Sequence, residues 1–233
     1  MYATTSYYTT LAAAYVRGRL AGSMAAREHF DLFAGPLEQL DADACCRLMA
    51  LGNDAGLRLH RFKRSMLLPR VRVVLGMLQG IQPTELLDVG SGRGVFLWPL
   101  LDAFPELPVT ALDLLDFRVA DLLAVRAGGV TALDALQGDI VTAKIAPAAY
   151  DVVTMLEVLE HIPDTRAALR SAARASRRFL VLSVPSKADD NPEHIHLFDE
   201  ATLRALLAEV GIDRVSTEYV RGHILVVARQ AGV

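Results

Sequence analysis

The sequence is poor in cysteine and in lysine and lacks a charge excess. Its only cysteines, Cys45 and Cys46, are neighbours, so they offer neither a disulfide framework nor a spaced metal-binding motif, which is typical of a reducing compartment. A net charge of −3 creates no positive field, so nucleic acid is not expected as a partner. The longest uncharged stretch, residues 1–16, lacks a basic leader, so we expect neither a signal peptide nor a membrane span. These absences predict a cytoplasmic protein.

The 233 residues are 52% hydrophobic, enough for a sizeable core, and the pattern changes near residue 80. Before that point the sequence predicts short helices, broken at Gly35-Pro36, at Gly52-Asn53 and before a helix that Pro69 opens. Apolar residues at three- and four-residue steps predict one buried helix face, formed by Phe30, Phe33, Leu37 and Leu40. We expect residues 1–80 to form an N-terminal helical cap or substrate region.

Residues 81–233 alternate between short apolar runs and amphipathic segments. Strands are predicted at residues 85–89, 107–112, 130–136, 150–156, 179–184, 214–220 and 223–228, and helices at 95–104, 117–126, 165–177 and 200–210. This alternation predicts an α/β fold with a doubly wound, mostly parallel, seven-stranded sheet. The last two strands flank Arg221-Gly222 and should pair as an antiparallel hairpin.

A glycine-rich loop lies between the first predicted strand and its helix. Asp88 is followed by Gly90, Gly92 and Gly94, and glycines at such a strand end let the backbone approach a ligand closely. Dinucleotide-binding loops have the spacing G-x-G-x-x-G, and here Val95 occupies the position of the third glycine. The spacing therefore argues against a nicotinamide-dependent dehydrogenase.

With its neighbours, this loop resembles motif I of the class I S-adenosylmethionine-dependent methyltransferases, acidic-x-Gly-x-Gly-x-Gly. Asp113 ends the second strand, where that family places the acid that binds the ribose hydroxyls. Gly138-Asp139-Ile140 resembles the family's adenine-binding turn, and residues 150–164 resemble its fourth-strand segment. The resemblance covers residues 85–228 and is to the ubiquinone-biosynthesis-like, or methyltransferase type 11-12, group and to the broader natural-product methyltransferases.

The resemblance implies S-adenosyl-L-methionine as the cofactor and a Rossmann-like methyltransferase fold. The residues that it assigns to cofactor binding are Asp88, Gly90, Ser91, Gly92, Gly94, Asp113, Leu114, Asp139, Ile140, Leu156 and Glu157.

Side chains suited to proton transfer follow the fourth and fifth strands. They are Glu157, Glu160 and His161, and then His194 and His196. If a helical turn follows the fourth strand, the first three share one face, and a later histidine would complete a ligand set that suits Mn²⁺. Alternatively, Glu157 holds backbone near the cofactor and His161 is a packing residue.

We nevertheless expect a site that needs no metal. Pro163 should cut the turn short, and Mg²⁺, the commonest ion in such chemistry, prefers oxygen to imidazole. Methyl transfer needs a base only when the acceptor must lose a proton. We assign the catalytic roles to His194, His161 and Glu157, with one of the histidines as the base or as the group that orients the acceptor.

Two further groups lie before residue 65. Tyr7, Tyr8 and Tyr15 could line a pocket, because their rings are apolar and their hydroxyls polar. A basic cluster could bind an acidic substrate or simply form a solvated helix face; it consists of Arg58, His60, Arg61, Lys63 and Arg64.

The sequence predicts S-adenosylmethionine-dependent methylation of a small molecule at oxygen or nitrogen. One alternative is metal-dependent RNA 2′-O-methylation, since the small-RNA methyltransferases share a Glu-x-x-Glu-His segment followed by a later histidine. Another is a non-catalytic scaffold subunit with the methyltransferase fold. The oligomeric state is left open, with a homodimer as one option.

Overall fold

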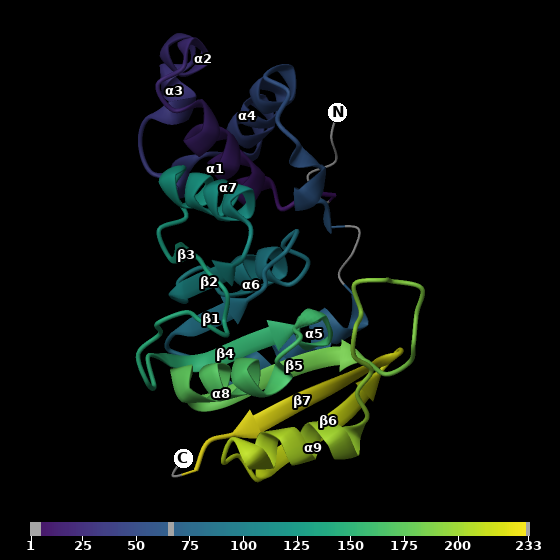
Figure 1. Cartoon of the computed structure of the whole chain (residues 1–233). Coiled ribbons are helices and arrows are strands. Elements are labelled where there is room, and N and C mark those ends of the chain that lie inside the picture. The colour runs from purple at the N-terminus through teal and green to yellow at the C-terminus, as the bar shows by residue number, and fades with distance from the viewer. Residues whose placement is uncertain (1–5, 65–67, 232–233) are drawn as a thin grey trace. The chain divides into compact units, whose positions relative to one another are not determined.

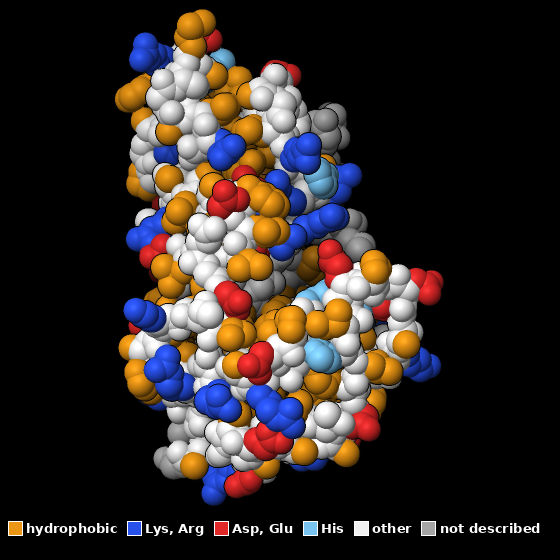
Figure 2. Space-filling model, in the orientation of Figure 1, with side chains coloured by type: hydrophobic (Ala, Val, Ile, Leu, Met, Phe, Trp, Pro, Cys, Tyr) orange, Lys and Arg blue, Asp and Glu red, His pale blue; other side chains and the backbone are white. Residues whose placement is uncertain are grey.

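The computed structural model describes residues 6–64 and 68–231 (Figure 1). The chain forms two compact units. Unit 1 comprises residues 1–67, 91–111 and 115–136, and unit 2 comprises residues 68–90, 112–114 and 137–233. Among the described residues, no helix is both long and apolar enough to cross a membrane. On the face seen in Figure 2, acidic and basic side chains are interspersed, as the small net charge suggests.

Unit 1 is mainly helical. Its helices are α1 (Thr9–Leu20), α2 (Met24–Glu28), α3 (Phe30–Phe33), α4 (Ala42–Asp54), α6 (Leu97–Ala103) and α7 (Asp116–Ala127), with 3₁₀ turns η1 (Leu37–Gln39) and η2 (Leu59–Phe62). It also holds most of β2 (Val109–Asp113) and β3 (Leu133–Gln137).

Helix α1 packs closely against α4 and α7 through small residues. A Cβ added at Gly18 would lie 1.9 Å from the carbonyl oxygen of Ala124, and one at Gly128 would lie 1.8 Å from that of Ala14. These distances leave no room for any side chain at either glycine. The helices therefore approach each other at backbone contact, and α1 is part of the core of unit 1.

Two predictions for the first eighty residues are wrong. Phe30 is 71% exposed, because α3 ends at Phe33 ahead of Gly35-Pro36 and the residues that follow do not continue its face. Leu37, which the predicted face includes, is buried as expected, and Leu32, which it does not include, is buried as well. Helix α4 also runs through Gly52-Asn53 and ends at Asp54.

The tyrosines and basic residues before residue 65 contribute to the packing of unit 1. Tyr15 is buried, and its hydroxyl donates a 2.9 Å hydrogen bond to Asp121, which also pairs with Arg61. Arg64 donates to Asp102 at 2.7 Å and lies over the ring of the buried Tyr8. These contacts join the segment around η2 to α1, α6 and α7.

Unit 2 contains most of the sheet. Its elements are helix α5 (Pro69–Ile81), strands β1 (Leu86–Val89), β4 (Tyr150–Leu156), β5 (Ser176–Pro185), β6 (Arg214–Val220) and β7 (His223–Arg229), turn η4 (Leu159–His161), and helices α8 (Thr165–Ala175) and α9 (Glu200–Glu209). Pro69 opens α5 as predicted, and Asp164 and Asp199 cap α8 and α9 by accepting backbone hydrogen bonds.

The seven strands have the order β3-β2-β1-β4-β5-β7-β6. Strand β4 runs parallel to β1 and to β5, and β7 is antiparallel to both β5 and β6. The predicted doubly wound sheet and its terminal hairpin are confirmed. The strand order reverses at β1 and β4, and ligands of such sheets bind beyond the carboxyl ends of the strands at that point.

A buried ion pair stabilises the opposite end of the central strands. The Asp151 carboxylate is almost fully buried and accepts hydrogen bonds from Arg178, with Nε at 2.6 Å from Oδ1, and from the Thr84 backbone. The Arg178 guanidinium holds the pKa of Asp151 below its ordinary value. This pair stabilises the sheet and lies away from the carboxyl ends of the strands.

Candidate functional site

The loop after β1 begins at Gly90, whose N–H donates a 2.7 Å hydrogen bond to the carbonyl of Leu112. Gly90 has a φ of 71°, and a Cβ there would lie 2.6 Å from Cγ2 of Val158. Both the conformation and the space therefore require glycine. Among the other predicted loop residues, Gly92 and Gly94 also have positive φ, and a Cβ at Gly94 would strike the ring of Trp98. Ser91, Gly92 and Gly94 lie in unit 1.

Two predicted acidic residues are buried at the ends of neighbouring strands. Asp88 is 2% exposed and accepts a 2.8 Å hydrogen bond from the hydroxyl of Thr154 on β4. Asp113 is 3% exposed, and its carbonyl accepts from the N–H of Gly138 at 3.0 Å. Leu114, the next residue, is 64% exposed. The backbone thus holds the end of β2 beside the turn that starts at Gly138.

That turn is closed by Asp139. Its carboxylate accepts a 2.8 Å hydrogen bond from the N–H of Val141, and its carbonyl accepts from Thr142 and Ala143. Ile140 is 3% exposed and belongs to the core of unit 2. Asp139 is exposed, so its side chain both stabilises the turn and faces solvent.

Glu157 follows β4 and Leu156 and has a left-handed φ of 57°. Its N–H donates to the carbonyl of Ser183, and the Ser183 hydroxyl donates back to its carboxylate at 2.7 Å. His223 Nδ1 lies 2.9 Å from the same carboxylate, and Arg70 Nε lies 3.8 Å from it. Burial lowers the pKa of His223 although Glu157 opposes this shift. The Glu157 side chain therefore connects β5, β7 and α5.

Glu160 is fully buried in the turn η4, and neither of its carboxylate oxygens has a hydrogen-bond partner among the residues that the structure describes. Burial raises its pKa to about 8, and the nearby negative charge of Glu157 adds to the shift. An unpaired buried carboxylate is costly, so Glu160 either is protonated or needs a cation beside it.

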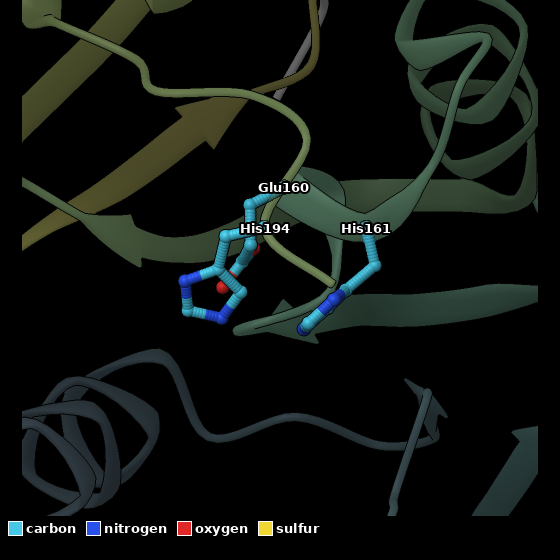
Figure 3. A group of neighbouring side chains, drawn as sticks. All are labelled: Glu160, His161 and His194. Atoms are coloured by element: carbon cyan, nitrogen blue, oxygen red, sulfur yellow. The ribbon is translucent and has the colours of Figure 1, made fainter. Parts of the chain in front are cut away.

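Two histidines lie beside Glu160. The rings of His161 and His194 meet edge to face with centroids 4.8 Å apart, and one ligand atom from each of the three side chains lies within 4.8 Å of the others. Figure 3 shows these side chains directed into one space, two from the turn after β4 and one from the loop before α9. We call this group the Glu160 cluster.

The loop before α9 is fastened to the same turn. The backbone N–H groups of Ile195 and His196 both donate to the carbonyl of Glu160, at 3.0 and 3.3 Å. His196 turns away from the cluster, and its Nε2 lies 3.1 Å from the carbonyl of Ile162. These bonds explain why His194, rather than His196, reaches Glu160.

In the turn after β4, Glu157, Glu160 and His161 do not share the single helical face that the sequence analysis considered. It begins at Leu159, so Glu157 precedes it and points to Ser183 and His223, while Glu160 and His161 face His194. Ile162 is extended before Pro163, as the proline predicted. Sequence reasoning missed Arg70, Ser183 and His223, since no spacing connects them to Glu157.

Comparisons with known proteins find similarity to methyltransferases, both in a family model and in a curated relative. Residues 60–217 match a family model described as a methyltransferase domain. Over 108 residues the chain is 36% identical to a ubiquinone biosynthesis O-methyltransferase of Vibrio atlanticus, in a match that covers 45% of this chain and 44% of that protein. The chain therefore matches less than half the length of this relative.

Solved structures share the fold. A SAM-dependent methyltransferase from Aquifex aeolicus aligns with a TM-score of 0.57 and 20% identity, over 70% of this chain and 90% of the other. The N-terminal domain of EvdMO1, solved with SAH bound, aligns with a TM-score of 0.53 and 21% identity, over 69% of this chain and 79% of the other.

Proposed function

The chain belongs to the methyltransferase-domain family, and from that premise we propose that it transfers a methyl group from S-adenosylmethionine to a hydroxyl oxygen of a small molecule. The observation that carries this proposal is the placement of two residue groups in unit 2. The predicted cofactor residues of unit 2, among them Asp88, Gly90 and Asp113, and the Glu160 cluster lie at or just after the carboxyl ends of strands that neighbour one another in the sheet.

On the cofactor side, three acidic residues have roles that fit a nucleoside ligand. The buried carboxylate of Asp113 ends β2 and is suited to accept both ribose hydroxyls, because charge-assisted hydrogen bonds are stronger than neutral ones. Asp139 follows at the turn beside it, and Asp88 lies at the end of β1. SAH, the demethylated form of the proposed cofactor, is bound in the similar domain of EvdMO1.

The relatives favour oxygen as the methylated atom. The Vibrio atlanticus protein is an O-methyltransferase by name, and a hydroxyl acceptor must lose a proton as its oxygen is methylated. S-adenosylmethionine supplies a methyl group that is already activated on a sulfonium, so the protein needs mainly to align the acceptor and to handle that proton. The Glu160 cluster offers the imidazoles for this purpose.

Glu157 has a positioning role in this proposal. Its carboxylate is engaged by the Ser183 hydroxyl and lies close to His223, which leaves it poorly placed to accept the acceptor's proton. By fixing the backbone between Leu156 and η4, it holds the start of the turn that carries Glu160 and His161.

Calorimetric titration with S-adenosylmethionine, S-adenosylhomocysteine and NAD tests the cofactor assignment. We expect both sulfur ligands to bind and NAD not to bind. Asp113→Ala should weaken binding of S-adenosylmethionine by about 1–3 kcal/mol, or roughly 5- to 150-fold, the range for losing a charge-assisted partner. Asp213→Ala, at an exposed residue before β6, is the matched control and should bind normally. Equal affinity of the two folded variants would reject the ribose assignment.

A further inference from the structure

We propose that His223 is the base of the reaction: its Nε2 takes the proton of the acceptor's hydroxyl, Glu157 fixes the imidazole, and Arg70 donates a hydrogen bond to the oxygen that loses the proton. This proposal rests on the proposed function and leaves the Glu160 cluster to orient the acceptor. All three residues belong to unit 2. Arg70 lies in the first turn of α5, Glu157 directly follows β4, and His223 begins β7.

The contacts of His223 select one tautomer of its imidazole. Nε2 lies 3.3 Å from Nη1 of Arg70, and because a guanidinium can only donate, Nε2 carries the lone pair. Nδ1 lies 2.9 Å from Oε2 of Glu157, so this nitrogen carries the proton. The second contact is close but not aligned as a full hydrogen bond among the described residues, and such bonds commonly tighten when a ligand binds. A carboxylate in this position stabilises the imidazolium that forms once Nε2 takes a proton.

Glu157 is itself fixed by β5. The Ser183 hydroxyl donates to Oε1 of Glu157 at 2.7 Å, and the Ser183 carbonyl accepts from the N–H of Glu157 at 2.9 Å. The left-handed φ of 57° costs free energy for any residue with a side chain. Such strain persists where surrounding contacts determine the conformation, and it is concentrated at functional sites. At Glu157 it keeps the carboxylate beside His223.

The two imidazoles of the Glu160 cluster have weaker partners. Nδ1 of His161 faces a backbone carbonyl, which has no charge to stabilise an imidazolium. Nδ1 of His194 lies 2.9 Å from Asp189, but the Asp189 side chain is 47% exposed, whereas that of Glu157 is 20% exposed. Solvent screens an exposed charge more than a partly buried one, so an imidazolium is stabilised best at His223.

Arg70 supplies the positive charge beside His223. Its side chain is 18% exposed, and its Nε lies 3.8 Å from the Glu157 carboxylate, beyond hydrogen-bond distance. Arg70 can therefore move its Nη1 hydrogen bond from His223 to an acceptor oxygen without breaking an aligned ion pair. Burial lowers the pKa of His223 and the charge of Arg70 adds to this, while Glu157 and Asp189 oppose the shift. At neutral pH the imidazole is therefore uncharged and able to take a proton.

The proton step balances in atoms and charge. As the acceptor's oxygen forms its bond to the methyl carbon, the O–H bond breaks and the proton moves to Nε2 of His223. The electron pair of the broken sulfur–carbon bond stays on sulfur, which becomes neutral, and the positive charge passes to the imidazolium beside Glu157. Arg70 stabilises the negative charge that develops on the oxygen while the proton leaves.

Nuclear magnetic resonance of the full chain with ¹⁵N-labelled histidine, without cofactor or acceptor, tests the state of His223. We expect the Nδ1–H tautomer and a pKa below the ordinary value of 6.5. Glu157→Gln should lower this pKa further, because it removes an opposing charge, and Arg70→Gln should raise it. His29→Asn, in unit 1, is the control and should leave the pKa of His223 unchanged. A proton on Nε2, or a pKa that Glu157→Gln raises or leaves unchanged, would overturn the proposal.

A phenol probe tests the proton transfer itself. 4-Nitrophenol absorbs visible light when ionised, so we would titrate it into the full chain saturated with S-adenosylhomocysteine, at a pH below the probe's own pKa. The bound probe should show the phenolate band. His223→Asn should weaken phenolate binding by about 10- to 150-fold, the range for losing a hydrogen bond to a charged group, and should still bind S-adenosylhomocysteine. His29→Asn should match the wild type.

The possible outcomes separate this proposal from the proposed function. A wild-type chain that gives no phenolate band, or a band that His223→Asn retains at full affinity, would overturn the role of His223. Failure of the proposed function would instead appear as a wild-type chain that does not bind S-adenosylhomocysteine. The resonance measurements of His223 do not depend on that ligand.

Discussion

Replacing Gly90 with alanine tests how the loop after β1 is built. In this conformation, with φ at 71°, an L-residue costs about 1–2 kcal/mol. The added Cβ would also lie 2.6 Å from Cγ2 and 3.2 Å from Cγ1 of Val158, and such overpacking costs about 1–3 kcal/mol. The two effects are independent, so we expect Gly90→Ala to lower the free energy of unfolding by about 2–5 kcal/mol.

A second variant separates the two costs. Val158→Ala removes the methyl groups that the new Cβ would strike, and by itself it should cost about 1 kcal/mol, because the valine is only half-buried. In the double variant the overpacking disappears while the backbone cost remains. The double variant should therefore be more stable than the sum of the single effects predicts, by about 1–3 kcal/mol.

Urea unfolding of the four proteins measures these terms, provided that the denaturant slope stays constant across the set. A loss below about 0.5 kcal/mol in Gly90→Ala would show that the loop relaxes at little cost and that the reasoning is wrong. Strict additivity in the double variant would instead show that Val158 is not what the Cβ meets.

Two other substitutions probe packing and electrostatics. Gly18→Ala should destabilise the protein by about 1–3 kcal/mol, because its Cβ would meet the Ala124 carbonyl. Gly76→Ala, in open space on α5, should instead stabilise the protein by about 0.5–1 kcal/mol. If thermal unfolding showed that both substitutions change the stability in the same direction, this account of the packing would be contradicted. Asp151→Asn should cost about 1.5–3 kcal/mol at pH 7. Because the pKa of Asp151 is lowered in the folded state, the carboxylate's contribution is complete above its ordinary pKa of 3.8 and is lost as the pH falls below it. Unfolding at pH 7 and pH 3 should therefore show the difference between wild type and variant shrinking in acid, and a constant difference would exclude the ion pair as its source.

The sequence alone was sufficient to predict the order of the strands and helices in the sheet region. Strands β4 and β6 have the predicted bounds, and the helices from α6 onward lie where the amphipathic segments predicted them, within a few residues. Periodicity is a local property, so neighbouring residues contain the information. The glycine positions were readable for the same reason, because a positive φ at Gly90 or Gly92 is a requirement of the local turn.

Local patterns failed where partners come from distant parts of the chain. Phe30 has the spacing of a buried helix face, yet it is exposed because the helix ends after four residues. The pattern of α1 did not reveal that Gly18 meets α7, since close helix approach depends on which small residues oppose each other in space.

In the candidate site, too, some features could be predicted from the sequence and others depend on the tertiary structure. The sequence placed Glu157, Glu160, His161 and His194 at the carboxyl ends of two strands, because parallel strands bring their ends to one edge of the sheet. Only the tertiary structure decided which of them meet. The backbone of Ile195 binds the Glu160 carbonyl and brings His194 to the buried carboxylate, while the left-handed backbone at Glu157 directs that side chain to Ser183. Hydrogen bonds between loops that are distant in sequence make these choices, and no spacing in the sequence records them.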